Sequence, residues 1–307
     1  MKIAYLLLAH HNPNQLVRLI NKLNNGAASF IIHYDLGSEP KEFNFLKGVF
    51  KEEKNVYFVD NRKKGYWGDF SIVNATLECI KFLLNEKVDF DYAFLLSGQD
   101  FPLKTNSEIH EFISQNNGKE FIHAQKMPTP FWKNGGMDRL EYYHFNSFKK
   151  NGITIKKISF KITTKLLIKF RVKRKLPNIE FYGGSQWWCL SSGFINYALE
   201  YINANERFAD FFKFTNVPDE MFFQTLIMNS PFKDCVSITT LSYIDWNRVE
   251  KPAIFRETDF DLLISRDHLF ARKFDEKIDQ EILELLDRHI SEKEKLQKFG
   301  SIQLRIV

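Results

Sequence analysis

Short apolar runs alternate with helix-like stretches along the amino-terminal third of the chain, and this alternation constrains the fold more than any other feature. A single crossover helix fits between each run and the next, which is the pattern of βα units. The alternation predicts an α/β fold in which a mixed, mostly parallel sheet is flanked by helices. The runs rich in apolar or β-branched residues are 3–9, 29–34, 56–59 and 91–96.

Two crossover helices can be placed from their spacing. In residues 12–23 apolar side chains recur at helical intervals after an Asn-Pro start. The same spacing occurs in residues 73–84, and either Asp69 or Ser71 can open that helix. We expect a single domain over residues 1–307.

A basic insert at about 148–176 interrupts this rhythm. The formal net charge is +5, but Lys149 to Lys175 holds eleven Lys and Arg and no acid, which leaves about −6 for the rest. Apolar residues every four positions favour an amphipathic helix there, whereas 153–155 and 170–173 alternate like strands. The apolar positions are Ile158, Ile162, Leu166 and Phe170.

Two interpretations of the insert remain open. Cations interleaved with Ile, Leu and Phe are typical of attachment to an anionic membrane face or to a polyanionic glycan. A solvated excursion whose charge keeps the chain soluble explains the composition equally well. Binding to nucleic acid is not expected, because no nucleic-acid motif accompanies the charge.

The sequence predicts a cytoplasmic protein that can lie peripherally on the inner face of the cell membrane. The first apolar run is too short for a signal-peptide core, and no stretch is long enough to span a bilayer. Cys79, Cys189 and Cys235 form neither a metal spacing nor a paired framework, which is typical of a reducing compartment.

The loop 97–106 has the composition of a site. It follows an apolar strand with small, polar and acidic residues, and ligands of open α/β sheets bind where strands end. The structural alternative is a strand-to-helix turn, with Thr105 or Asn106 as the N-cap and Glu108 in the first turn.

Several segments together resemble glycosyltransferase family 14, the core-2/I-branching β-1,6-N-acetylglucosaminyltransferases and peptide O-xylosyltransferases. They occur in the same order as in that family and extend over roughly residues 2 to 290. The chain is identified as a bacterial-type member on this basis. The segments are Ile31-Ile32-His33-Tyr34-Asp35, Gly65-Tyr66-Trp67-Gly68-Asp69, Ser97-Gly98-Gln99-Asp100, Gly184-Ser185-Gln186-Trp187-Trp188, Val217-Pro218-Asp219-Glu220, Tyr243-Ile244-Asp245-Trp246 and Phe270-Ala271-Arg272-Lys273-Phe274-Asp275.

The resemblance implies a GT-A type fold and an inverting, metal-independent transfer from a UDP-sugar donor to a hydroxyl of a glycan or glycolipid acceptor, with no cofactor. Glu220 matches the family's general base; on composition alone it is also a common first-turn acid of the helix expected over 221–228. Two Asp-x-Asp triplets, 89–91 and 259–261, lack the strand-end context of a metal motif.

A cation must then stabilise the leaving diphosphate. By resemblance Lys273 holds this position, and Arg248, Lys251 and Arg256 are candidates for a second basic group. Arg272 lies beside Lys273, and a solvated role is expected for it because neighbouring side chains point apart on strands and helices.

The remaining site residues also follow from the resemblance. Ala9, His10, Asp35 and Trp67 are predicted to hold the nucleotide, although Trp67 could simply fill the space between a strand and a helix. His33, His123 and His144 are expected to be structural or rim residues. The residues predicted for the transferred sugar and the acceptor are Gln99, Asp100, Lys104, Ser185, Gln186, Trp187 and Trp246.

The favoured donor is UDP-N-acetylglucosamine, with UDP-xylose next. The segment 272–282 is similar to the xylosyltransferase branch. The alternative from a different class is a catalytically silent glycan-binding or scaffold protein that keeps the fold. A dehydrogenase is excluded, because no Gly-x-Gly-x-x-Gly follows the first strand.

Overall fold

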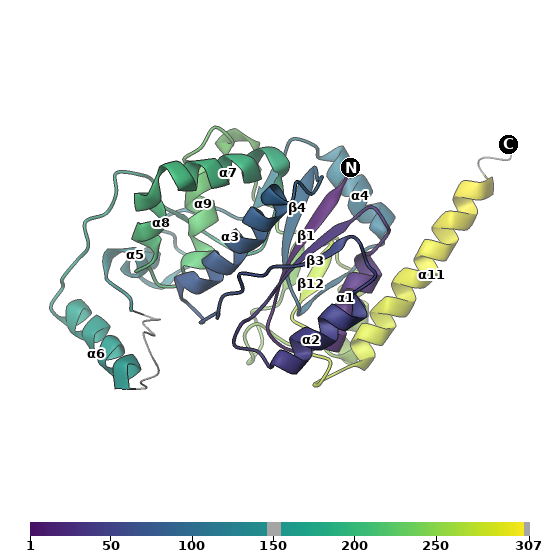
Figure 1. Cartoon of the computed structure of the whole chain (residues 1–307), viewed down its shortest axis with the longest axis horizontal. Helices are drawn as coiled ribbons and strands as arrows, with labels where there is room; N and C mark the ends of the chain where they lie inside the picture. Colours follow the sequence, from purple (N-terminus) through teal and green to yellow (C-terminus); the bar gives the residue numbers. More distant parts are fainter. Residues whose placement is uncertain (146–154, 304–307) are drawn as a thin grey trace.

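A seven-stranded mixed sheet forms the centre of the molecule (Figure 1). The computed structural model describes residues 1–145 and 155–303. The strand order is β10-β6-β9-β4-β1-β2-β3. These strands are β1 (Ile3–Ala9), β2 (Ser29–Tyr34), β3 (Val56–Phe58), β4 (Tyr92–Ser97), β6 (Glu120–Ile122), β9 (Trp188–Ser191) and β10 (Val236–Ser237).

Most neighbouring strands of this sheet run parallel. The β1–β2, β1–β4, β2–β3 and β6–β10 pairs are parallel, and only β9 runs antiparallel to its neighbours β4 and β6. The α/β class with a mixed, mostly parallel sheet is therefore confirmed. The four predicted strands lie within a residue or two of the observed ones.

Helices cover both faces of the sheet and divide the core into two apolar layers (Figure 1). Along β1, Tyr5 and Leu7 contribute to one layer and Ala4 and Leu6 to the other, as the alternation of side chains on a strand requires. The first layer packs against α1 (Pro13–Leu23), α2 (Pro40–Val49), α4 (Asn106–Gln115), α10 (Phe260–Ile264) and α11 (Glu281–Gln303), and the second against α3 (Phe70–Asn85), α5 (Asp138–Glu141), α7 (Ser192–Ala204), α8 (Glu206–Phe212) and α9 (Phe222–Met228).

Caps settle two helix starts that the sequence left open. The Asp69 side chain accepts a hydrogen bond from the Ser71 backbone N–H and opens α3. Thr105 is the N-cap of α4 and forms a capping box with Glu108. The carboxyl end of the loop 97–106 is thus a helix cap, while its first residues remain candidates for the site.

A second, three-stranded sheet brings distant segments to the end of β4. Its order is β11-β12-β5, with β12 parallel to β11 and antiparallel to β5. The register places Arg272 beside Asp100. The bounds are β5 (Asp100–Pro102), β11 (Ser242–Ile244) and β12 (Phe270–Arg272), and a separate pair is formed by β7 (Gln125–Lys126) and β8 (Tyr182–Gly183).

The basic insert contains α6 (Ile155–Lys169), which confirms its predicted helix. The strand-like interpretation of 170–173 is wrong, because these residues leave the helix as a turn and an irregular segment. Residues 148–154 of the predicted insert fall outside the described residues, so of the strand-like piece 153–155 only Ile155 is described, and it begins α6. No helix in the described part of the chain is both long and apolar enough to cross a membrane.

Short 3₁₀ turns join several of these elements. The predicted position of Glu220 is wrong, because this residue ends a 3₁₀ turn and α9 begins two residues later. Glu220 is therefore not a first-turn residue of the α-helix itself. The turns are η1 (Lys133–Gly136), η2 (Pro218–Glu220), η3 (Lys233–Cys235) and η4 (Glu257–Asp259).

Candidate active site

A cavity of about 990 Å³ opens at the carboxyl ends of the parallel strands. Strands β1, β2 and β4 all end there, because parallel strands present the same ends at one edge of a sheet. Residues far apart in sequence line this cavity together. The predicted site residues among them are Ala9, His10, Asp35, Trp67, Gln99, Ser185, Gln186, Trp187, Glu220, Trp246 and Lys273.

The amino-terminal loop and Lys273 form one electrostatic group. Burial lowers the pKa of His10 to about 4, and His11 and Lys273 act in the same direction. Burial also lowers the pKa of His11, with a smaller effect of Lys273. His10 is therefore neutral at pH 7, and the positive charge beside it comes from Lys273.

Asp35, directly after β2, connects the loops that line one side of the cavity. Its carboxylate accepts hydrogen bonds from the backbone N–H groups of Gly37, at 2.5 Å, and Gly65, at 2.6 Å. These bonds fix the loop that carries Trp67 relative to the end of β2. Trp67 is 86% exposed, so the interpretation that it fills space between a strand and a helix is wrong. It stands at the cavity with its ring open to a ligand.

Arg272 and Lys273 both line the cavity. The Arg272 guanidinium lies 4.1 Å from the centre of the Trp187 ring and 3.6 Å from the Asp100 carboxylate. A solvated role for Arg272 is therefore wrong, because this side chain is held between an aromatic ring and a buried acid. Burial, followed by the charge of Arg272, lowers the pKa of the Lys273 ammonium. Two adjacent cations thus face one cavity.

Glu220 lies at the cavity and forms an ion pair with Arg139. The two side chains are 2.7 Å apart and only 30% and 23% exposed, respectively. Burial raises the pKa of Glu220, and Arg139 opposes that change. The Arg139 guanidinium also stacks 4.0 Å from the centre of the Trp132 ring. Arg139, which belongs to α5, is therefore held in place by its contacts with Glu220 and Trp132.

A hydrogen bond between two backbone segments fixes the position of Glu220 at the cavity. The Gly184 N–H donates to the Glu220 carbonyl oxygen at 2.8 Å. A Cβ atom at Gly184 would lie 1.7 Å from the His123 carbonyl oxygen, so only glycine fits there. Gly184, which precedes the predicted residues Ser185, Gln186 and Trp187, thus joins their loop to η2.

Asp219 lines the cavity beside Glu220, and its sequence context predicted no role for it. It is 9% exposed, and its Oδ1 atom has no hydrogen-bond partner. Burial, followed by the charge of Glu220, raises the pKa of Asp219 to about 7. Asp219 and Glu220 are neighbours with one cation, Arg139, close to both. The signal in the sequence was the pair of adjacent acids in Pro218-Asp219-Glu220.

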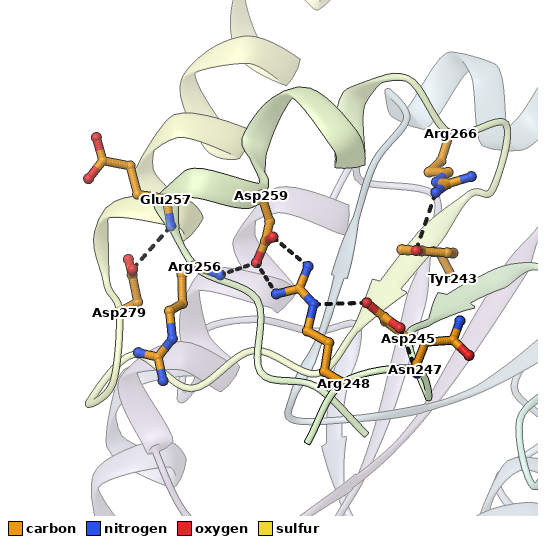
Figure 2. A network of polar contacts seen from close by, with 9 residues as sticks. All are labelled: Tyr243, Asp245, Asn247, Arg248, Arg256, Glu257, Asp259, Arg266 and Asp279. Atoms are coloured by element: carbon orange, nitrogen blue, oxygen red, sulfur yellow. Dashed lines mark hydrogen bonds and ion pairs between the residues drawn. The ribbon is translucent and has the colours of Figure 1, made fainter. Parts of the chain in front are cut away.

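The three other basic candidates do not line the cavity. Arg248 donates to Asp245 at 2.9 Å and to both carboxylate oxygens of Asp259 (Figure 2). These two acids neutralise its charge. Figure 2 shows the side chain of Arg256 on the far side of this network from Asp245, and Lys251 is likewise absent from the cavity lining.

Asp100 and Lys104 also lie away from the cavity, which differs from their predicted contact with the sugar. Asp100 is fully buried and accepts a hydrogen bond from the Ser97 backbone N–H at 2.7 Å. It also pairs with Arg272, so it positions two residues that line the cavity without lining it itself. Lys104 donates to the Arg266 carbonyl oxygen at 2.7 Å. Gln99 does line the cavity, although its side chain also donates to the Phe274 carbonyl oxygen at 3.3 Å.

Exposed aromatic side chains mark the rim. Trp246 is 54% exposed and Phe131 is 75% exposed, and both line the cavity. Phe131 was not predicted, because an aromatic residue in a loop has no periodic pattern that separates a ligand contact from packing. His33 and His123 reach the cavity lining as well. Within residues 1–145 and 155–303, no cluster of three or more His, Cys, Asp or Glu side chains has the arrangement of a metal site.

Comparison with known families decides the assignment. Residues 3–262 match the Branch family, described as Core-2/I-Branching enzyme. The chain belongs to this family. The match covers most of the chain and includes the segments that contribute Asp35, Glu220 and Trp246, whereas Arg272 and Lys273 lie just beyond it.

Relatives of the family share modest identity with the chain. Xylosyltransferase 2 of Rattus norvegicus is 29% identical over 94% of this chain and 34% of its own length. The β-1,3-galactosyl-O-glycosyl-glycoprotein β-1,6-N-acetylglucosaminyltransferase 4 of Mus musculus is 25% identical over 95% of this chain and 66% of its own. The chain thus spans about a third of the length of the xylosyltransferase it matches.

Solved structures resemble the chain only loosely. Mouse xyloside xylosyltransferase 1 in its apo form is 12% identical with a TM-score of 0.37, and the comparison covers 88% of this chain and 97% of that one.

Proposed function

We propose that this chain is an inverting glycosyltransferase that moves a sugar from a UDP-sugar to a hydroxyl of a glycan or glycolipid acceptor. The observation that supports it most strongly is the convergence of Glu220 with Arg272 and Lys273 on one cavity, from segments about fifty residues apart. A carboxylate and a pair of cations are the groups that such a displacement needs. Membership of a family whose relatives are named as glycosyltransferases supports the same reaction.

Glu220 acts as the general base. Its carboxylate takes the proton of the acceptor hydroxyl while the hydroxyl oxygen attacks the anomeric carbon, and the bond from that carbon to the diphosphate breaks. Burial raises the pKa of the Glu220 carboxyl, and the ion pair with Arg139 opposes that change and favours the ionised form that a base needs. Attack from the face opposite to the leaving group inverts the anomeric configuration.

Arg272 and Lys273 stabilise the charge that develops on the leaving diphosphate. Both side chains are partly desolvated, and electrostatic stabilisation is stronger where water is excluded. Lys273 also lies close to His10 and His11, which places a phosphate-binding charge beside the amino-terminal loop. The nucleotide then occupies the region of Ala9, His10, Asp35 and Trp67, with the base stacked on the Trp67 ring.

The two cations are the basis for proposing that the transfer needs no metal ion. Asp100, the acid near the end of β4, is fully buried, and its carboxylate lies 3.6 Å from the Arg272 guanidinium. Metal-dependent transfer would require an accessible carboxylate at this position to chelate the ion. We propose N-acetylglucosamine as the transferred sugar, with xylose second.

The catalytically silent alternative would be favoured if Glu220 were ion-paired out of reach of any pocket. Glu220 is ion-paired, yet it lines the cavity and keeps 30% of its side chain exposed. No observation on the described residues favours the silent alternative.

The test is acceptor-dependent release of UDP. The purified chain is incubated with UDP-N-acetylglucosamine or UDP-xylose and a panel of oligosaccharides in EDTA, and the product's anomeric configuration is read by nuclear magnetic resonance. We expect transfer with inversion from one donor. Transfer that requires Mn²⁺, or product with retained configuration, would contradict the proposed mechanism.

A further inference from the structure

Helix α6 exposes apolar and cationic side chains on the same surface. Ile162 is 50% exposed and Leu166 is 46% exposed, and they lie four residues apart on one face of the helix. Lys165 and Lys169 are also exposed and flank these two residues on that face. Phe170, directly after the helix, is 71% exposed. The family chemistry described above uses none of these residues.

The segment is attached to the body of the protein through Thr164, on the other side of the helix from Ile162, and through the residues that follow the helix. The Thr164 hydroxyl accepts from the Phe145 backbone N–H at 3.3 Å. Beyond the helix, Lys173 pairs with Glu141 at 2.6 Å, and the buried Arg174 guanidinium stacks 4.0 Å from the centre of the Phe211 ring. These contacts orient α6, so its exposed face is presented in a defined direction. Figure 1 shows α6 at one end of the molecule, away from the central sheet.

The charge of the α6 surface and its exposed apolar side chains together indicate which kind of partner it binds. Residues 149–175 contain no acid, so a second copy of the chain would bring like charges together at this surface. A polyanionic glycan would satisfy the cations but not Ile162, Leu166 and Phe170. A bilayer with anionic lipids satisfies both, because apolar side chains enter the interface while lysines extend to the headgroups.

We propose that α6 and the turn after it form a docking surface for an anionic membrane. Lys165, Lys169 and Arg171 contact acidic headgroups, while Ile162, Leu166 and Phe170 enter the acyl boundary. Lys173 and Arg174 are engaged by the protein and take no part. The contact is peripheral and reversible.

A matched pair of variants tests this surface. Lys165→Gln/Leu166→Ser removes one charge and one apolar side chain from α6. Lys295→Gln/Leu296→Ser makes the same two changes on α11, where Lys295 is exposed and Leu296 is 72% exposed. Binding of the full chain is measured by co-sedimentation with vesicles of phosphatidylcholine alone or mixed with phosphatidylglycerol. Circular dichroism melting checks that both variants fold.

The proposal predicts binding to the mixed vesicles only, and weaker binding at high salt. The α6 variant should lose at least tenfold in partition coefficient, since one cation alone accounts for about fivefold, and the α11 variant should match the wild type. Equal binding to neutral vesicles, or equal loss in both variants, would overturn it. So would binding to a soluble polyanion without binding to vesicles. None of these outcomes depends on transferase activity.

Discussion

Replacing Glu220 by Gln should abolish most transfer while leaving the fold and the nucleotide site intact. Gln keeps the size of the side chain and offers an oxygen to the Arg139 N–H that lies 2.7 Å from Glu220. It cannot accept the acceptor's proton. General-base catalysis contributes about 10²- to 10⁴-fold, so the transition state should lose roughly 3 to 5.5 kcal/mol of stabilisation.

The cost in folding stability should be much smaller. Glu220 and Arg139 are 30% and 23% exposed, so solvent screens part of their attraction, and burial already opposes the ionised form of Glu220. We expect a change of no more than about 1 kcal/mol in the free energy of unfolding. UDP affinity should stay within about twofold, because a general base acts on the acceptor.

The assay is acceptor-dependent UDP release, with UDP affinity measured separately by calorimetry. Glu180→Gln is the matched control, because Glu180 is also ion-paired, with Lys126, but its side chain is 55% exposed and outside the cavity lining. The control should keep full activity. Full activity in Glu220→Gln, or a parallel loss of UDP binding and transfer, would refute the assignment of the base.

Five further variants probe the rest of the site and its surroundings. Lys273→Ala should weaken UDP binding at least tenfold by calorimetry. Arg139→Met should raise the pKa of Glu220 and move the acidic limb of the kcat/KM profile to higher pH, whereas Arg139→Lys should restore it. The pKa of Asp219, about 7 against an ordinary 3.8, makes the folded state bind the extra proton, so this residue lowers stability as pH rises from about 4 to 7. Asp219→Asn should remove that dependence, worth on the order of a few kcal/mol, in chemical denaturation at several pH values. Arg248→Met should reduce stability by roughly 1–2 kcal/mol, allowing for its 38% exposure, with unchanged UDP affinity.

The alternation of apolar runs was enough to predict the amino-terminal strands and helices. Local signals narrowed each of two helix caps to a pair of candidates, and the structure selects Asp69 and Thr105, which accept from a backbone N–H two and three residues away, respectively. Such contacts join residues that are only a few positions apart in the sequence. Segment order and the family resemblance then gave Glu220 and Lys273 as candidates, and both line the cavity.

Contacts between distant segments could not be predicted in this way. Arg139 reaches Glu220 from 81 residues away, and nothing in the sequence around Arg139 indicates that partner. The pairing of β12 with β5 turns Asp100 away from the cavity and brings it to Arg272. Arg248 had the right charge for a diphosphate ligand, but two acids already bind it (Figure 2). Charge in a sequence does not reveal which cations are already neutralised.

Calorimetric titration of the full chain with UDP, UDP-N-acetylglucosamine and UDP-xylose tests whether the chain is a metal-independent UDP-sugar transferase. Each ligand is titrated once in EDTA and once in Mn²⁺. We expect one site per chain, metal-independent binding, and a preference for one of the two UDP-sugars. Binding that appears only with Mn²⁺ would contradict the role of Arg272 and Lys273, and no binding of any of the three would contradict the transferase assignment itself.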